Sequence, residues 1–239
     1  MTVLNMIAAI IQARMTSTRL PGKIMADIGG KPLLKRMLDR VRRATKLNKI
    51  IVATTVNSAD DVAAKLCTDE DVDVFRGSEH DVLDRFHGAA QAAGAISVVR
   101  LTADCPMIDP QLIDEVVSRY SHGDCDYASN AIERTYPDGL DVEVFSRAAL
   151  DEAQAKANHP YLREHVTPYI HGNSDYGSGN FRRAAVTYAA DFSHIRWTVD
   201  RPDDLERVRE LFHLLPENFT WLQALSVATR YPSLLGVAQ

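Results

Sequence analysis

The chain has 239 residues, of which 46% are hydrophobic, so it is long enough for one large domain with a sizeable core. Its net charge of −5 and pI near 5.9 argue against a nucleic-acid-binding protein, which is usually basic. The three cysteines are an odd number without a C-x-x-C pair, which fits neither a disulfide framework nor a zinc site and favours the reducing cytoplasm. The longest apolar run near the start, Met6 to Ile11, is too short to cross a membrane and lacks a preceding basic segment, so we expect no membrane span and no signal peptide.

Strand and helix patterns alternate through the first 120 or so residues. Short apolar runs, typical of strands buried on both faces of a sheet, lie at 7–11, 49–54, 72–75 and 97–102. The helices predicted between and after them cover 31–44, a segment capped by Ser58, 81–93, and a segment beginning at Pro110. This alternation predicts an α/β fold of three layers, with a doubly wound, mostly parallel sheet and right-handed crossovers.

The alternation loosens after Ser121. We expect strands at 126–130, 139–145 and 181–187 around helices at 147–156 and 161–171, with a loop at 171–180 where turn-forming residues are dense. A strand at 195–199 then precedes a helix at 202–215. Because no linker or internal repeat divides the chain, we predict one domain over 1–239, with a small α+β subregion at 127–188.

The most informative segment is the basic loop from Gln12 to Lys23, just beyond the first strand. Open α/β sheets bind their ligands at this edge. Arg14, Arg19 and Lys23, together with hydroxyl groups and backbone N–H groups, suit a polyphosphate. The glycine patterns of the Walker A and dinucleotide loops are missing. An exposed polar loop with incidental charges has a similar composition, so the residues alone leave both interpretations open.

Two aspartates, 96 positions apart, each follow a predicted strand. Asp104 comes after 97–102 and Asp200 after 195–199, so both are expected at the edge that carries the basic loop. Magnesium binds a few carboxylates together with phosphate oxygens and waters, which makes the pair a candidate metal site. An aspartate after a strand also often caps the next helix, an alternative that stays open for Asp200. The D-x-D patterns at 69–73 are typical of glycosyltransferase metal sites, but they precede a strand and are interpreted as a charged surface.

Several blocks of the sequence resemble the sugar cytidylyltransferases, a family that includes the CMP-Kdo and CMP-sialic acid synthetases and the spore coat polysaccharide protein F group. The residues IIQARMTSTRLPGK at 10–23 resemble the family's opening signature. Further blocks follow in order at 74–85, 100–106, 139–145, 163–168 and 198–205. They look most like the spore coat group.

The resemblance implies a nucleotide-diphospho-sugar transferase fold and the transfer of CMP from CTP to an anionic sugar, sialic- or Kdo-like, with release of pyrophosphate, for surface polysaccharide synthesis. It implies Mg²⁺ held by Asp104 and Asp200, and phosphate contacts from Arg14 and Lys23. We count these four residues as catalytic. Substrate-binding neighbours are expected in the same loop, at Gln12, Ala13, Ser17 and Arg19.

The resemblance also places recognition of the base after the third strand, at Arg76, Gly77 and Ser78. Ser78 would equally cap the next helix, and Asp81 with Arg85 would form a simple ion pair one turn apart. The acceptor is expected to contact the second half, at Asp141, Glu143, Arg163 and His165. A solvated sheet face and an interface histidine are the alternatives for this group.

The acceptor's identity is left open by Arg100, a further substrate-binding candidate. It begins the segment RLTA, where the acid-sugar synthetases usually carry a glutamine. The expected partners are CTP and an acidic sugar, without nucleic acid or membrane, in a cytoplasmic homodimer joined through 127–188. The alternatives are another nucleotide or acceptor, a sugar-nucleotide-dependent glycosyltransferase, and a non-catalytic nucleotide-sugar sensor. The four candidate catalytic residues argue against the sensor.

Overall fold

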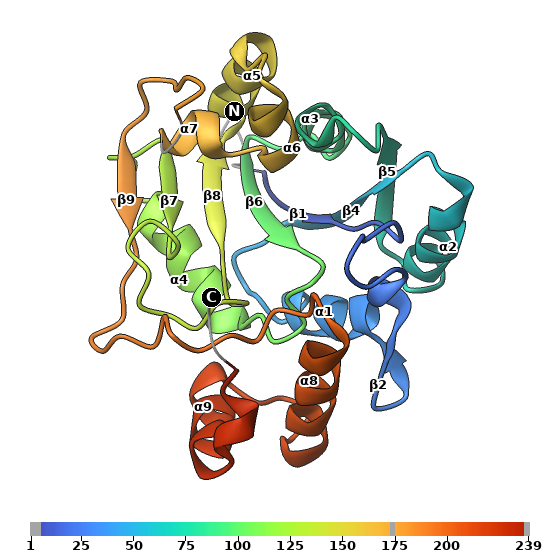
Figure 1. The fold of residues 1–239 in the computed structure, drawn as a ribbon. Helices are drawn as coiled ribbons and strands as arrows, with labels where there is room; N and C mark the ends of the chain where they lie inside the picture. Colours follow the sequence, from blue (N-terminus) through green and yellow to red (C-terminus); the bar gives the residue numbers. More distant parts are fainter. Residues whose placement is uncertain (1–5, 173–174, 237–239) are drawn as a thin grey trace.

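A seven-stranded sheet forms the centre of the computed structural model, which describes residues 6–172 and 175–236. The strand order is β5-β4-β1-β6-β8-β7-β9 (Figure 1). The strands are β1 (Ile7–Gln12), β4 (Lys49–Thr55), β5 (Asp73–Gly77), β6 (Ser97–Thr102), β7 (Tyr127–Ser129), β8 (Glu143–Ser146) and β9 (Arg183–Ala185). Neighbouring strands of this sheet run parallel, except that β8 is antiparallel to both β6 and β7. A short antiparallel pair, β2 (Asp27–Ile28) and β3 (Lys31–Pro32), lies apart from it.

Helices cover both faces of the sheet, which confirms the predicted fold class. The central strands are mostly apolar, and their apolar side chains alternate between two cores. Ala9 and Ile11 of β1 belong to one core, and Ala8 and Ile10 to the other. The first core is covered by α1 (Leu33–Val41), α2 (Asp61–Asp69), α4 (Pro110–Tyr120), α8 (Pro202–Leu214) and α9 (Trp221–Arg230). The second is covered by α3 (Val82–Ala92), α5 (Arg147–Lys156), α6 (Pro160–His165) and α7 (Pro168–His171).

Several element predictions were wrong in detail. Ser58 is not a cap: Asn57 accepts the N–H of Ala59 and opens a 3-10 turn, Ser58–Asp60, before α2. The helix predicted over 161–171 is broken into α6 and α7 at Val166, whose φ of 69° does not continue a helix. Helix α9 was not predicted. Among the described helices, none combines the length and the apolar composition that a membrane crossing requires.

The segment 195–199 is extended but is not a strand, since its one β-bridge joins Arg196 to Asp138. It is held instead by single backbone hydrogen bonds to separate parts of the chain. The N–H of Trp197 donates to Asp138 (2.7 Å), and the N–H of Val199 donates to the carbonyl of Asp104 (2.8 Å). Because the indole of Trp197 is fully buried in the first core, the segment is fixed without a ladder. This anchoring carries Asp200 to the edge of the sheet.

Gly139 allows this segment to pass close to the chain before β8. Its φ is +105°, and a Cβ there would lie 2.8 Å from the backbone nitrogen of Thr198 and from the carbonyl carbon of Trp197. Such a contact is far inside van der Waals distance, and backbone atoms cannot move aside cheaply. Gly94 provides a comparison, because its φ is +63° but a Cβ there would meet no atom within 4 Å.

We predict that Gly139→Ala lowers the free energy of unfolding by about 3 kcal/mol, because strain at positive φ and overpacking add. Gly94→Ala, which introduces strain alone, should cost about 1 kcal/mol. Urea unfolding of the two variants beside the parent chain measures both values. Equal losses would show that the close approach of 139 to 197–198 contributes nothing to stability.

Candidate active site

The loop that follows β1 is anchored to the neighbouring strand by a buried aspartate. Asp60 is fully buried and accepts the N–H of Met15 (2.6 Å) and the N–H of Thr55 (3.0 Å). The N–H of Gly22, which has a φ of 74°, donates to the carbonyl of Met15 (2.8 Å) and closes the loop on itself. These hydrogen bonds fix the conformation of the loop at the carboxyl end of β1, where ligands of open α/β sheets bind.

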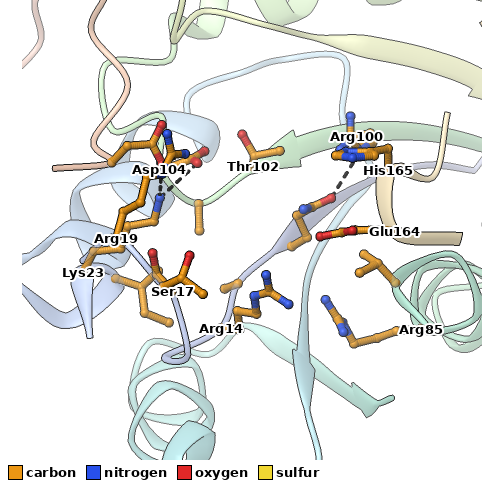
Figure 2. Close-up of a pocket in the computed structure, with 17 residues that line it drawn as sticks. Arg14, Ser17, Arg19, Lys23, Arg85, Arg100, Thr102, Asp104, Glu164 and His165 are labelled. Atoms are coloured by element: carbon orange, nitrogen blue, oxygen red, sulfur yellow. Dashed lines mark hydrogen bonds and ion pairs between the residues drawn. The ribbon is translucent and has the colours of Figure 1, made fainter. Parts of the chain in front are cut away.

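This loop borders a cavity of about 350 Å³ (Figure 2). Five cationic side chains line it against three carboxylates, so an anionic ligand is favoured. The lining includes ten of the predicted site residues: Gln12, Ala13, Arg14, Ser17, Arg19, Lys23, Arg100, Asp104, His165 and Asp200. The remaining lining residues are Thr18, Ile24, Val82, Arg85, Thr102, Ala103 and Glu164.

At one end of the cavity, Lys23 joins the two candidate metal ligands. Its Nζ lies 3.1 Å from Oδ2 of Asp104, 2.9 Å from Oδ1 of Asp200 and 2.8 Å from the carbonyl oxygen of Val199. These two carboxylate oxygens cannot be farther apart than the sum of their distances to Nζ, about 6 Å. The sequence analysis expected the two carboxylates to meet in one crevice, and the structure brings them there.

Asp200 is held from three sides. Arg19 and Lys23 share its Oδ1, while Arg196 donates to Oδ2 at 2.6 Å. Arg196 also pairs with Asp204, 2.9 Å away. Burial opposes the charge of Asp204, but hydrogen bonds from Arg196, from the N–H of Asp200 and from Arg207 outweigh it and lower the pKa of Asp204 to about 2. The orientation of Asp200 is thus set by two cations of the loop after β1 and by Arg196, which is itself held by Asp204 of α8.

Asp104 is ionised in this setting. Burial acts against its charge, but the ammonium of Lys23 and hydrogen bonds from Thr102 and Cys105 hold the pKa of Asp104 below its usual value. Within residues 6–172 and 175–236 no cluster of three or more His, Cys, Asp or Glu side chains forms a metal cage. Two carboxylates within about 6 Å of each other fit magnesium, which completes its shell with phosphate oxygens and waters.

A second cavity, of about 550 Å³, adjoins the first. Arg100 and His165 line both, so they mark the junction. The predicted acceptor residues Asp141 and Glu143 line the second cavity, although Asp141 precedes β8 instead of sharing a strand face with Glu143. Its remaining lining residues are Tyr127, Ala131, Ile132, Arg134, Tyr161, Thr167, Pro168, His171, Gly172 and Arg183.

The wall between the two cavities is a chain of buried polar side chains. Arg100 pairs with Glu143 and donates from Nε to the amide oxygen of Gln12 (3.2 Å). Tyr127 donates its hydroxyl to Oε1 of Glu143 (2.6 Å). Although burial opposes ionisation, the guanidinium of Arg100 and the hydrogen bonds from Tyr127 and Thr167 hold the pKa of Glu143 below its usual value. The carboxylate of Glu143 is therefore fully engaged by these groups, and it fixes the position of the Arg100 guanidinium.

Four predicted site residues do not line either cavity. The guanidinium of Arg76 is engaged by the carbonyls of Thr55 and Asn57 and by the carboxylate of Asp61. Gly77 has the side chain of Arg85 beside its Cα. Ser78 accepts the N–H of Asp81 (3.0 Å), but the helix cap expected at Ser78 is Asp81 itself, whose side chain accepts the N–H of Asp84. Arg163 pairs with Asp81 (2.5 Å), which replaces the expected pair between Asp81 and Arg85. The predicted contacts of these four residues with a substrate stay predictions.

Arg85 is a cavity residue that the sequence analysis did not select. It is buried, one guanidinium nitrogen donates to the carbonyls of Ser78 and Glu79, and its Nε has no partner among the described residues. Burial, and the nearby charge of Arg14, lower the pKa of Arg85. In Figure 2 the guanidinium groups of Arg14 and Arg85 point toward each other. In the sequence, Arg85 lies four residues after Asp81, a spacing typical of an ion pair on one helix, so its position in the cavity could not be predicted.

Comparison with known proteins now decides the family. A family model described as cytidylyltransferase matches residues 8–225. The chain belongs to the cytidylyltransferase family. The resemblance drawn from the sequence motifs is thereby confirmed, and the chain is a nucleotidyltransferase that uses CTP.

Three relatives of this cytidylyltransferase illustrate the match. The spore coat polysaccharide biosynthesis protein SpsF of Bacillus subtilis is 35% identical over 216 residues, covering 87% of each chain. The 3-deoxy-manno-octulosonate cytidylyltransferase of an Anaeromyxobacter species is 29% identical over 238 residues, covering 86% of this chain and 97% of the relative. A solved cytidylyltransferase structure from Leptospira borgpetersenii superposes with a TM-score of 0.89 at 32% identity, covering 98% of each chain.

The buried pair of Arg100 and Glu143 gives a prediction on stability. Glu143→Gln should lower the free energy of unfolding by about 3 kcal/mol at neutral pH, because it leaves the charge of Arg100 buried and unpaired. The folded-state pKa of Glu143 lies below the unfolded value near 4.5, so its contribution is complete above that pH and is lost as the pH falls below it. The variant should therefore lose less stability than the parent on acidification. If the free energy of unfolding fell equally with pH in the two proteins, this account would be contradicted.

Proposed function

We propose that this cytidylyltransferase transfers CMP from CTP to an anionic sugar, sialic-, nonulosonic- or Kdo-like, with release of pyrophosphate, for surface polysaccharide synthesis. The observation that carries the proposal is the position of Asp104 and Asp200, which lie together at one end of a cationic cavity. A second cavity adjoins it at Arg100 and His165.

In this proposal the first cavity holds the nucleotide. Arg14 makes no hydrogen bond or ion pair with any residue of the described chain, so its guanidinium is available to the triphosphate. Arg19 is exposed and, among the described residues, pairs with Asp200 alone, which leaves further N–H groups for phosphate oxygens. Both residues belong to the anchored loop, and a fixed cation stabilises charge on a leaving pyrophosphate without reorganising.

Asp104 and Asp200 are the proposed ligands of Mg²⁺. When bound there, the ion would neutralise phosphate charge and act as a Lewis acid on the transferring phosphoryl group. The chain's own contribution is to hold and orient both carboxylates, through Lys23, Arg19 and Arg196.

The second cavity is proposed to bind the acceptor sugar. Its lining carries three arginines against two carboxylates, a positive balance that favours an anionic acceptor. Because Arg100 and His165 line both cavities, an acceptor hydroxyl placed beside them would face the nucleotide. The relative from Anaeromyxobacter is named for an acidic sugar, which supports the same class. Positioning of the two substrates then supplies much of the rate.

We further propose a single domain over 1–239 that works in the cytoplasm as a homodimer, with residues 127–188 as the acceptor and dimerisation subregion. The three cysteines are all buried and unpaired, which suits a reducing compartment. Tyr161 and Tyr176 are exposed aromatic residues of the subregion, and exposed aromatic side chains are enriched at interfaces.

The proposal predicts pyrophosphate release that requires CTP, Mg²⁺ and an acidic sugar together. A screen of four nucleoside triphosphates against acidic and neutral sugars, followed by pyrophosphate detection, measures it. Arg183→Gln should raise KM for the acidic acceptor about tenfold, because one charged hydrogen bond is lost, and leave KM for CTP unchanged.

Arg182→Gln is the matched control, since Arg182 is the adjacent residue, is exposed and pairs with Asp126 outside both cavities. It should leave both KM values unchanged. Release with neutral sugars only would overturn the anionic acceptor. Release with another triphosphate in preference to CTP would contradict the proposed donor.

A further inference from the structure

The ammonium group of Lys23 is saturated. It has three N–H donors, and three acceptors lie within 3.1 Å of Nζ: Asp104, Asp200 and the carbonyl of Val199. Its side chain is only 10% exposed. In this arrangement no donor of Lys23 remains for a phosphate oxygen, although the family resemblance implies such a contact.

Lys23 is also positioned where a metal ion would compete with it. Figure 2 shows its ammonium beside Asp104, and dashed lines mark their contact. A divalent cation bound by both aspartates would lie close to Nζ, and like charges at such short range repel strongly. Phosphate contact and metal binding therefore impose the same requirement, since each needs the ammonium to leave its present acceptors.

Arg19 and Arg196, the other cations beside Asp200, do not bond both aspartates. Arg19 is 56% exposed and contacts Asp200 without Asp104. Arg196 contacts the other oxygen of Asp200 and is tied to Asp138 and Asp204. Among the residues that the structure describes, Lys23 is the cation that bonds both aspartates.

We propose that Lys23 is a place-holder for the divalent cation. In the metal-free protein its ammonium keeps the two carboxylates together. The nucleotide's phosphates then draw the ammonium away, and the metal takes over its contacts with Asp104 and Asp200. The inference rests on the proposed metal site, and it adds an order: metal binding is weak until a nucleotide is present.

The Lys23 ammonium can leave its acceptors with little change in the backbone. Lys23 begins a short 3-10 turn, Lys23–Met25, whose hydrogen bonds involve main-chain atoms. Its N–H donates to Leu20 and its carbonyl accepts from Ala26, so the main chain is fixed at both groups. The flexible four-carbon stem of a lysine can redirect its ammonium while these bonds persist. Arg14 and Ser17 of the same loop line the cavity into which it would turn.

The test is Mn²⁺ affinity in the absence of nucleotide, measured by the loss of the free-ion electron paramagnetic resonance signal. Lys23→Met and Lys23→Gln both remove the competing charge, and each should bind Mn²⁺ at least about tenfold more tightly than the parent chain. Arg14→Met is the matched control: it removes one positive charge from the same cavity but contacts neither aspartate. It should gain much less affinity. Adding Asp104→Asn to Lys23→Met should abolish the gain.

Two results would overturn the inference. One is parent-like Mn²⁺ affinity in both Lys23 variants, with thermal unfolding that shows them folded. The other is an equal gain from Arg14→Met, which would reduce the effect to general charge. Pyrophosphate release by the parent chain is scored separately. Turnover with CTP but no gain would reject the place-holder alone, whereas a gain without turnover would reject the proposed function alone.

Discussion

Two carboxylates that lie within about 6 Å of each other at a largely buried site repel unless a cation stands between them, and in this chain that cation is Lys23. The rest of the site follows from this constraint. Asp104 stands beyond the end of β6, and Asp200 lies on an extended segment bonded to it through Val199. The loop after β1 delivers the lysine from a third direction. Three distant parts of the sequence thus meet at one ammonium group.

The same edge of the sheet also organises the second cavity. Arg100 and Glu143 are register partners on the antiparallel strands β6 and β8, so their ion pair spans the boundary between the parallel and antiparallel parts of the sheet. Arg100 lines both cavities, while Glu143 and Tyr127 line the second cavity and complete the wall between them. The reversal of β8 thereby places a proposed acceptor pocket beside a proposed nucleotide pocket.

Local patterns were enough to predict the central strands and the basic loop, because apolar runs specify buried strands and ligands bind beyond their carboxyl ends. The meeting of Asp104 with Asp200 was predicted from a strand at 195–199 that does not form, and the hydrogen bond from Val199 to Asp104 brings the two aspartates together instead. Local patterns could not reveal contacts between distant residues. Asp60, which looks like a helix-start acid, anchors the loop instead, and Arg196 ties Asp200 to α8. The break at Val166 had no signal either, since a β-branched residue is disfavoured at positive φ and only the surrounding packing imposes it.

The central claim is that Asp104 and Asp200 act as one metal centre for transfer of CMP. The most direct measurement is kcat/KM for pyrophosphate release in Asp104→Asn, Asp200→Asn and the double variant, each checked for unchanged thermal stability. Each single change keeps the side-chain shape and should reduce kcat/KM by about a thousandfold, and the double variant should be no worse than the worse single one, because either loss disables the same site. If the losses in kcat/KM of the two single variants instead multiplied in the double variant, and each single variant kept Mg²⁺-dependent turnover, the two aspartates would act independently. That result would contradict the claim.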